Sequence, residues 1–277
     1  MRVLKTIFDF YINSSIHVAL AVYALSWLTL LQFGIHFDEP MLLFIFFSSI
    51  TGYNFVKYFG LAKFHHRSLA DWLRIIQVFS LVCFFGLCFF ALQLKTTTLL
   101  YVGIFAIATF LYAVPLIPKA IFLDQQMNLR SISGLKIYVI ALVWTGVTVF
   151  LPLMNNEQEL SNDVLIVAGQ RFVFVMALML PFEIRDLSYD SLRLSTIPQK
   201  IGVKRTKILG LLLLIAFMGF EFLKSIVMLD QILVSGAISV LLLIVLLFSK
   251  KNQIDYYSSF FVEGIPIIWL LLLLMIR

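Results

Sequence analysis

The stretch that decides the fold is residues 164–186, VLIVAGQRFVFVMALMLPFEIRD, a long apolar run followed directly by charged residues. About 20 apolar residues cross the ~30 Å hydrocarbon core of a bilayer as a helix. Inside lipid, every backbone N–H and C=O group must find its partner within the protein, and a helix satisfies its own groups. This run therefore predicts a transmembrane helix with one charged residue, Arg171, inside it.

Runs of the same kind recur along the whole chain of 277 residues. Hydrophobic residues make up 61% of the chain and charged residues only 13%, a balance that excludes a soluble globular domain. The sequence predicts one all-α domain over residues 1–277, a polytopic membrane bundle of about nine transmembrane helices. The predicted spans are Asn13–Phe33, Pro40–Phe59, Leu73–Leu92, Leu99–Ile117, Gly134–Leu153, Val164–Phe182, Ile208–Met228, Ile232–Phe248 and Phe260–Ile276.

The basic residues predict the orientation of the chain. Most of the 21 Lys and Arg residues fall on one side of the membrane if the amino terminus is cytoplasmic, and short cytoplasmic segments are the ones enriched in these residues. We therefore expect an integral protein of a bacterial-type inner membrane, with its N-terminus cytoplasmic and its C-terminus outside. This bias and the attraction to anionic membrane lipid explain the net charge of +6, so no nucleic-acid partner is expected.

Three carboxylates follow the sixth predicted span. If the helix continues beyond the apolar run, spacings of three and four residues place Glu183, Asp186 and Asp190 on one stripe. Such carboxylates repel one another unless a cation lies between them, and a site made only of oxygen ligands favours a hard ion such as Mg²⁺. Arg185 and Arg193 are close enough in sequence to contact a phosphate held by that ion. The alternative is a solvated helix end at the membrane surface.

The connection after this span continues with a recognisable series of motifs. It contains Asp186-x-x-x-Asp190, Ser-Thr-Ile-Pro198 and Ile-Gly202-Val-Lys-Arg, while the fourth span ends in Tyr112-Ala-Val-Pro115 and Lys119. These motifs resemble the UbiA superfamily of membrane prenyltransferases. The resemblance implies a bundle of two four-helix pseudo-repeats plus a ninth helix, arranged around a central cavity open toward the cytoplasm. It also implies Mg²⁺-dependent transfer of a prenyl chain from a polyprenyl diphosphate to a lipophilic acceptor, with Asp186 and Asp190 as catalytic residues.

The first acidic motif of that family departs from the pattern in this chain. Its place after the second span reads Asn54-Phe-Val-Lys57-Tyr58, which keeps the asparagine and lacks both aspartates. A lysine replaces the charge of a second metal ion but not its Lewis acidity. We therefore expect one Mg²⁺ on Glu183, Asp186 and Asp190, and diphosphate contacts from Asn54, Lys57, Arg67, Arg185, Arg193 and Lys200. The alternative is that Lys57 only extends from its helix end to the membrane surface.

Charged residues inside the predicted spans need partners, because charge in hydrocarbon is costly. Arg171 and Glu221 lie at nearly the same predicted depth, about 22 and 21 Å from the inner ends of consecutive spans at 1.5 Å per residue. We expect them to form an ion pair that holds two helices in register. Glu263, early in the ninth span, is expected to face the cavity.

Three functions compete on this evidence. The first is a prenyltransferase-like enzyme that acts on a lipophilic substrate with a diphosphate group. The second is a noncatalytic relative that binds an isoprenoid lipid or a membrane partner, which the altered first motif favours. The third is a small-molecule transporter, suggested by the internal duplication and the buried charges. The sequence indicates neither the acceptor, the prenyl chain length nor the oligomeric state.

Overall fold

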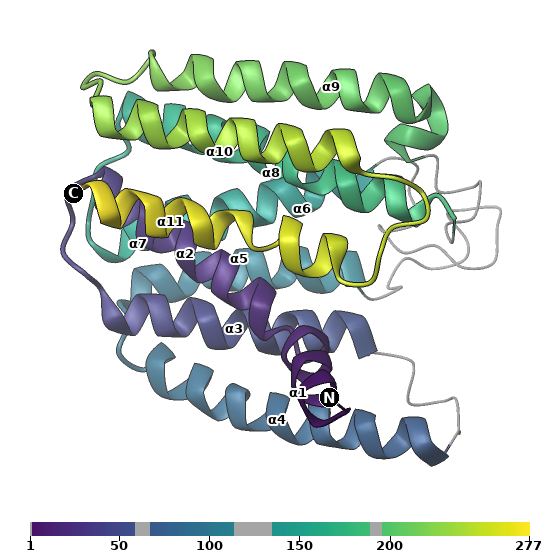
Figure 1. The fold of residues 1–277 in the computed structure, drawn as a ribbon. Coiled ribbons are helices and arrows are strands. Elements are labelled where there is room, and N and C mark those ends of the chain that lie inside the picture. Colours follow the sequence, from purple (N-terminus) through teal and green to yellow (C-terminus); the bar gives the residue numbers. More distant parts are fainter. Residues whose placement is uncertain (1, 59–66, 114–134, 189–195) are drawn as a thin grey trace, which may run out of the picture.

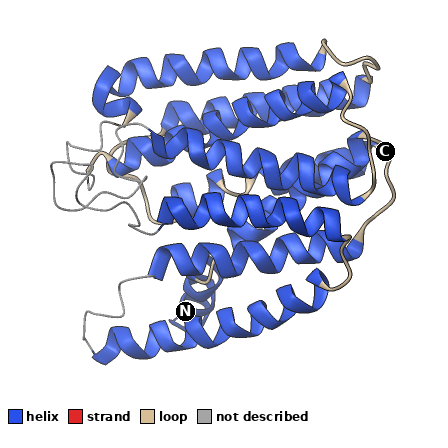
Figure 2. Ribbon diagram, turned by 180° about the vertical axis from the view of Figure 1, so that it is seen from behind, coloured by secondary structure: helices blue, strands red, loops and turns tan. Residues whose placement is uncertain are grey.

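The computed structural model describes residues 2–58, 67–113, 135–188 and 196–277, and some side chains at the ends of these ranges are left undescribed. Within these ranges all regular structure is helical (Figure 2), which confirms the all-α prediction. Each predicted span overlaps a helix, and the fifth and ninth overlap helices that adjoin a short π-helical segment. The elements are α1 (Arg2–Asn13), α2 (Ile16–Gln32), α3 (Glu39–Tyr58), α4 (Arg67–Ala91), α5 (Thr96–Ala113), α6 (Leu135–Thr145), η3 (Gly146–Phe150), α7 (Leu151–Asn155), α8 (Asn162–Asp186), α9 (Ile197–Glu221), α10 (Leu229–Phe248), η5 (Tyr257–Val262) and α11 (Ile265–Ile276).

Not all of these helices are long and apolar enough to cross a membrane. Among the described residues five helical stretches meet that requirement, or six if α1 and α2, which are bent by 52° at the break between them, count as one span. Several long apolar helices of this kind support an integral membrane protein. The described residues thus contain five or six candidate spans, and the count of nine stays a prediction from the sequence.

Helix α9 shows why a predicted span falls short. It begins at Ile197, where a capping box between Thr196 and Gln199 satisfies the first backbone groups. Basic residues fill its first turns, and the helix ends at Glu221 rather than at Met228 as predicted. Its apolar part, residues 208–220, is shorter than the ~20 residues that a straight span requires.

The segment after α9 turns back onto the bundle instead of extending the helix. The Lys224 ammonium lies 2.7 Å from the Glu221 carboxylate. The backbone N–H and hydroxyl of Ser225 donate to Asp163, at the start of α8, over 2.9 and 3.0 Å. These contacts explain why the helix stops before the predicted end.

The helices lie side by side across the view of Figure 1, with α9 and α4 at opposite edges of the bundle. One continuous apolar core joins α2, α3, α6, α8, α9, α10 and α11, and it contains the rings of Phe174, Phe217 and Trp269 in tilted and edge-to-face contact. Helix α8 is the most enclosed of the candidate spans, since two thirds of its apolar window is buried inside the bundle. Residues at the end of α8 therefore have a fixed position relative to several neighbours.

The two ends of the bundle carry different residues. At one end, called the outer end here, Arg277 donates to the Leu31 carbonyl over 2.9 Å, and Asp38 accepts from Asn155 and Asn156 at 2.8 Å each. The opposite end, called the inner end, carries the last turn of α8 and the first turn of α6. These two ends match the outer and inner sides predicted from the basic residues, while the side of the membrane that each faces stays a prediction.

Candidate functional site

Helix α8 continues beyond its apolar run, as the sequence predicts, and carries two of the three expected carboxylates. It contains Pro181 without a break and ends at Asp186, so Glu183 and Asp186 lie one turn apart on its last turns. The helix ends at Asp186, so the place of Asp190 on the same stripe stays a prediction. Asp190 itself lies outside the described residues.

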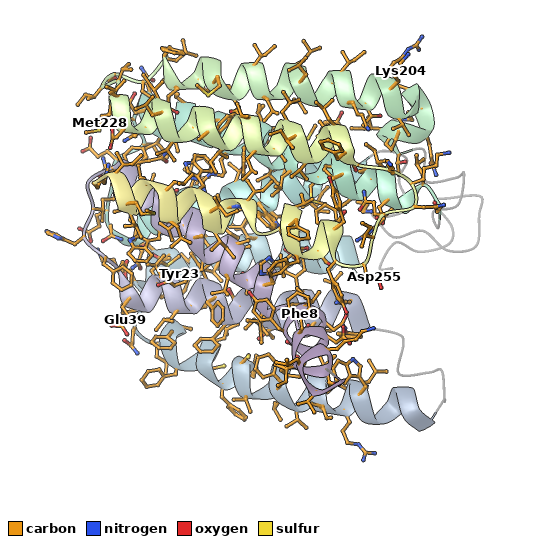
Figure 3. All side chains as sticks on the ribbon, viewed as in Figure 1. Phe8, Tyr23, Glu39, Lys204, Met228 and Asp255 are labelled. Carbon is orange, nitrogen blue, oxygen red and sulfur yellow. The ribbon has the colours of Figure 1, made fainter. Side chains whose placement is uncertain are left out.

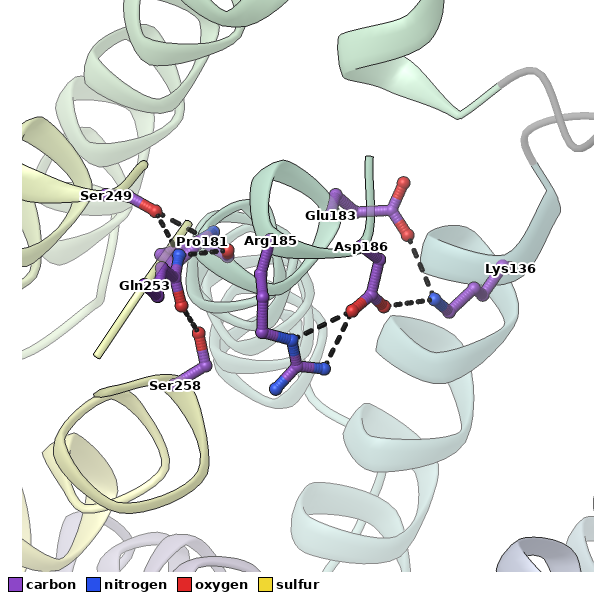
Figure 4. Close-up of polar contacts among 8 residues, drawn as sticks. All are labelled: Lys136, Pro181, Glu183, Arg185, Asp186, Ser249, Gln253 and Ser258. Carbon is purple, nitrogen blue, oxygen red and sulfur yellow. Dashed lines mark hydrogen bonds and ion pairs between the residues drawn. The ribbon is translucent and has the colours of Figure 1, made fainter. Parts of the chain in front are cut away.

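A lysine from a neighbouring helix lies between these two carboxylates. The Nζ atom of Lys136, in the first turn of α6, is 3.1 Å from Asp186 and 3.5 Å from Glu183 (Figure 4). Glu183 is almost fully buried, whereas Lys136 and Asp186 each keep 18% of their side chains exposed. The ammonium therefore supplies the positive charge that the acidic stripe requires.

Arg185 completes the contacts of Asp186 from the other side. Its guanidinium lies 2.8 Å from the Asp186 carboxylate through Nη2 and donates to it through Nε over 2.9 Å (Figure 4). The guanidinium also lies over the Phe182 ring. Both donors reach the same oxygen, Oδ1, and hydrogen bonds between ionised groups are among the stronger ones in proteins. Asp186 is thus shared by two cations from two helices.

Two further charges from other helices couple to this group. Lys57, in the last turn of α3, and Arg185 both interact electrostatically with Glu263, which follows η5. Lys57 donates from Nζ to the Asn13 carbonyl over 3.1 Å and lies over the Tyr58 ring. Helices far apart in sequence therefore bring charges together at the inner end, a group that we call the inner charge cluster: Lys57, Lys136, Glu183, Arg185, Asp186 and Glu263.

The last connection of the chain is fixed to the same end of α8. The Pro181 carbonyl accepts from Gln253 over 3.0 Å and from Ser249 over 3.4 Å (Figure 4). Gln253 also donates to Ser249 over 2.8 Å and accepts from Ser258, the second residue of η5. These bonds hold η5, and with it Glu263, against the turn of α8 that carries Glu183.

The predicted Mg²⁺ site does not fit the described part of this cluster. Among the described residues no group of three or more His, Cys, Asp or Glu side chains is placed to hold a metal ion. Of the three predicted ligands, Glu183 and Asp186 are described, and the Lys136 ammonium lies within ion-pair distance of both. A protonated lysine repels Mg²⁺ at this distance. Asp190, the third predicted ligand, lies outside the described residues.

Asn54, predicted to contact a diphosphate, is buried in a hydrogen-bonded joint of the fold. Its Oδ1 accepts from Ser15 over 2.8 Å, and its Nδ2 donates to the Ser14 carbonyl over 3.0 Å and to Ser80 over 2.8 Å. These bonds connect α3 to the bend between α1 and α2 and to α4. These hydrogen bonds give Asn54 a structural role that does not involve a ligand.

The other predicted contacts are placed only in part. Lys200 lies exposed on the first turns of α9. Arg67 begins α4, but its side chain lies outside the described part of the chain, as do Arg193 and the residues Pro115 and Lys119. Of the predicted phosphate contacts, the structure brings Lys57 and Arg185 into one electrostatic group.

The predicted Arg171–Glu221 ion pair is not formed among the described residues. Arg171 is 1% exposed and donates to the Leu25 carbonyl over 2.7 Å and to the hydroxyls of Thr148 and Thr29 over 3.2 Å each. Its guanidinium also lies 5.5 Å from the centre of the Trp269 ring. Arg171 is therefore held by α2, η3 and α11 and not by α9.

Glu221 has a different set of partners. Its carboxylate accepts from Lys224 over 2.7 Å, from Gln170, and from Ser235 over 3.4 Å. Lys224 lies three residues later in the chain, so its contact with Glu221 needs no neighbouring helix. The buried polar network of Gln170, Glu221, Lys224, Gln231 and Ser235 is called the outer polar network below.

Comparison with models of known protein families, with curated proteins and with solved structures finds no match. The family resemblance of the motifs thus stays a prediction from the sequence.

Lys136 is the residue of this site that sequence reasoning missed. The sequence places it at the inner end of the fifth predicted span, where orientation alone explains a basic residue. The missing signal is the packing of α6 against α8, which brings its first turn beside the last turn of α8. The sequence signal for such a partner is a lysine at the inner end of a helix that can pack beside the acidic residues.

Proposed function

We propose that this chain binds the diphosphate headgroup of a polyprenyl lipid at the inner charge cluster, with the prenyl chain in the apolar bundle. The observation that carries the proposal is the convergence of Lys57, Lys136 and Arg185, from α3, α6 and α8, at one end of a membrane bundle. Cations of this kind bind phosphate oxygens by charge-assisted hydrogen bonds.

The carboxylates of the cluster help this binding by holding the cations in place. Arg185 uses Nε and Nη2 for Asp186, and a guanidinium has five N–H groups, so further donors are available to an incoming phosphate. Arg185 is 36% exposed, and Lys57 is exposed as well. A diphosphate that reaches these two groups from the inner side needs little rearrangement of the bundle.

The proposal includes the finer features expected from the sequence. They are a nine-helix bundle, a cytoplasmic N-terminus, and a cavity that opens toward the inner side. The five or six candidate spans among the described residues support a polytopic bundle, and the number nine rests on the apolar runs of the sequence.

Binding of a radiolabelled polyprenyl diphosphate to the purified chain in detergent tests the proposal. We expect Lys57→Gln and Arg185→Gln each to weaken binding about tenfold, the effect of losing ~1.4 kcal/mol of a charged hydrogen bond. Arg205→Gln, an exposed arginine of α9, is the matched control and leaves binding unchanged. Equal affinity in all three variants would contradict the proposal.

A second candidate function is transfer of the prenyl chain to a lipophilic acceptor, and Asp186-x-x-x-Asp190 is the feature that favours it. Incubating the protein with labelled diphosphate and native lipid extract, with and without Mg²⁺, separates it from binding alone. An enzyme forms a labelled product with Mg²⁺, and Asp190→Asn abolishes that product. Binding without product for any chain length identifies a noncatalytic isoprenoid-binding protein.

A further inference from the structure

Helix α1 lies across the bundle instead of along it. It is bent by 52° from α2, and Figure 1 shows it nearly end-on while its neighbours run across the view. Its flanks pack on two elements that are distant in sequence. Phe10 contacts the rings of Trp72 and Phe79 in α4, and Phe8 contacts those of Tyr256 and Phe260 (Phe8 is labelled in Figure 3).

The two remaining faces of α1 differ in polarity. At about 100° per residue, Val3, Leu4 and Ile7 share one face, and these side chains are 72%, 72% and 61% exposed. Lys5, Asp9 and Asn13 share the opposite face, at spacings of four residues. A helix whose flanks pack on the bundle, with one apolar and one polar free face, has the form of a helix lying in the membrane interface.

The polar face of α1 also lines a groove of about 490 Å³. Its lining residues are Lys5, Thr6, Asp9, Asn13, Trp72 and Tyr256. Asp9 accepts a hydrogen bond from the Tyr256 hydroxyl, and this negative neighbour raises the pKa of that phenol. The groove thus presents one cation and one anion, a single turn of helix apart, between two aromatic rings of the kind that favour the headgroup region.

We propose that this groove binds a phospholipid whose headgroup carries both a phosphate and a primary ammonium, of the phosphatidylethanolamine type. Lys5 contacts the phosphate and Asp9 the ammonium, while the apolar face of α1 lies against the acyl chains of the same leaflet. Charge complementarity selects this occupant. A headgroup with phosphate alone leaves Asp9 without a cation, and a quaternary ammonium has no N–H to donate to it.

Native mass spectrometry of the purified chain tests this site. The protein is offered equal amounts of phosphatidylethanolamine, phosphatidylcholine and phosphatidylglycerol with identical acyl chains. We expect the first lipid to be retained several-fold more than the other two. Asp9→Asn removes this preference without affecting phosphatidylglycerol, and Lys5→Gln lowers retention of all three phosphate headgroups. Glu159→Gln, in the connection before α8, and Lys251→Gln, in the connection before η5, replace exposed residues away from the groove and are the controls that change nothing.

Two outcomes overturn the proposal: equal retention of the three lipids by the unmodified chain, or an unchanged preference in Asp9→Asn. Because Asp9 bonds to Tyr256, thermal unfolding of Asp9→Asn in detergent checks that the variant is folded. Lys5 is exposed, so Lys5→Gln tests the site without that complication. Ile7→Gln probes the apolar face separately. It weakens retention of all lipids equally if α1 lies in the interface, and unchanged retention contradicts that placement.

Discussion

The inner charge cluster and the outer polar network both bring charges from several segments together in a membrane bundle. They differ in how much of the charged side chains is exposed to solvent. In the outer polar network, Glu221 and Lys224 are 1% and 9% exposed, and their partners are protein groups on α8, α9 and α10. In the inner charge cluster Glu183 is also buried, at 2% exposed, but the side chains of Lys136 and Asp186 are 18% exposed and that of Arg185 is 36% exposed. The closed group suits a structural role, and the open group suits a ligand.

The difference also concerns what a lost charge leaves behind. Removing one member of a closed pair strands its partner away from water, which is among the costliest changes in a folded protein. Removing one member of an open pair leaves a partner that water can still reach, so stability changes little and binding changes more. Stability and binding measurements therefore separate the two regions.

The largest effect is expected at Glu221. Glu221→Ala leaves the Lys224 ammonium buried without its carboxylate, and the free energy of unfolding in detergent is expected to fall by about 3–5 kcal/mol. Glu157→Ala is the control, because the Lys95–Glu157 pair at the same end has the same chemistry but is 45% and 77% exposed. We expect only a small change there. Equal losses for the two variants would show that the outer polar network is not closed.

A smaller loss is expected from Arg171→Lys. Lysine keeps the charge but lacks the planar fork that contacts Leu25, Thr29 and Thr148, so at least one charged hydrogen bond, about 2 kcal/mol, is lost. Arg277→Lys is the matched control. Arg277, like Arg171, donates to a backbone carbonyl of α2, that of Leu31, but its side chain is partly exposed. Thermal unfolding of the two variants compares them. Identical melting temperatures would argue against a structural role for Arg171.

Arg185→Gln is expected to cost about 1 kcal/mol of stability or less, because the Arg185–Asp186 pair is open to solvent. Asp186 also retains its contact with Lys136. The same denaturation assay measures this change beside Glu221→Ala. A loss as large as that of Glu221→Ala would mean that the inner charge cluster is a structural core like the outer one.

The smallest effect concerns pH at the exposed Lys95–Glu157 pair. The hydrogen bond from Lys95 lowers the pKa of Glu157 below its ordinary value of 4.5. Because the folded pKa is depressed, the contribution of the pair is complete above pH ~4.5 and is lost as the pH falls through the folded pKa. Unfolding curves of the unmodified chain and of Lys95→Gln are thus expected to differ slightly at neutral pH and to converge in acid. A difference in stability between the two proteins that grows as the pH falls would contradict this prediction.

The sequence predicts the helices of this fold well, because continuous apolar runs need no knowledge of their neighbours. It predicts poorly which residues pair with the buried charges. The predicted Arg171–Glu221 pair rests on similar depth in consecutive spans, and depth does not show which way a side chain points around its helix. Glu221 instead uses Lys224, three residues later, and Arg171 uses hydroxyls and a carbonyl of other helices.

The candidate site shows the same limit. The acidic residues at the end of α8 are recognisable from their spacing, and their place on one face is confirmed for Glu183 and Asp186. Their cation is a lysine of α6 that only the packing of the two helices reveals. The end of α9 was placed too late, because contacts of Lys224 and Ser225 with the bundle override an apolar pattern.

The most direct test of the central claim compares two lipids that differ only in their headgroup. Equilibrium binding to the purified chain is measured for a polyprenyl diphosphate and for the alcohol of the same chain length. We predict that the diphosphate binds at least tenfold more tightly, and that the double variant Lys57→Gln/Arg185→Gln binds the two equally. Equal affinity for both lipids in the unmodified chain would contradict a phosphate site at the inner charge cluster.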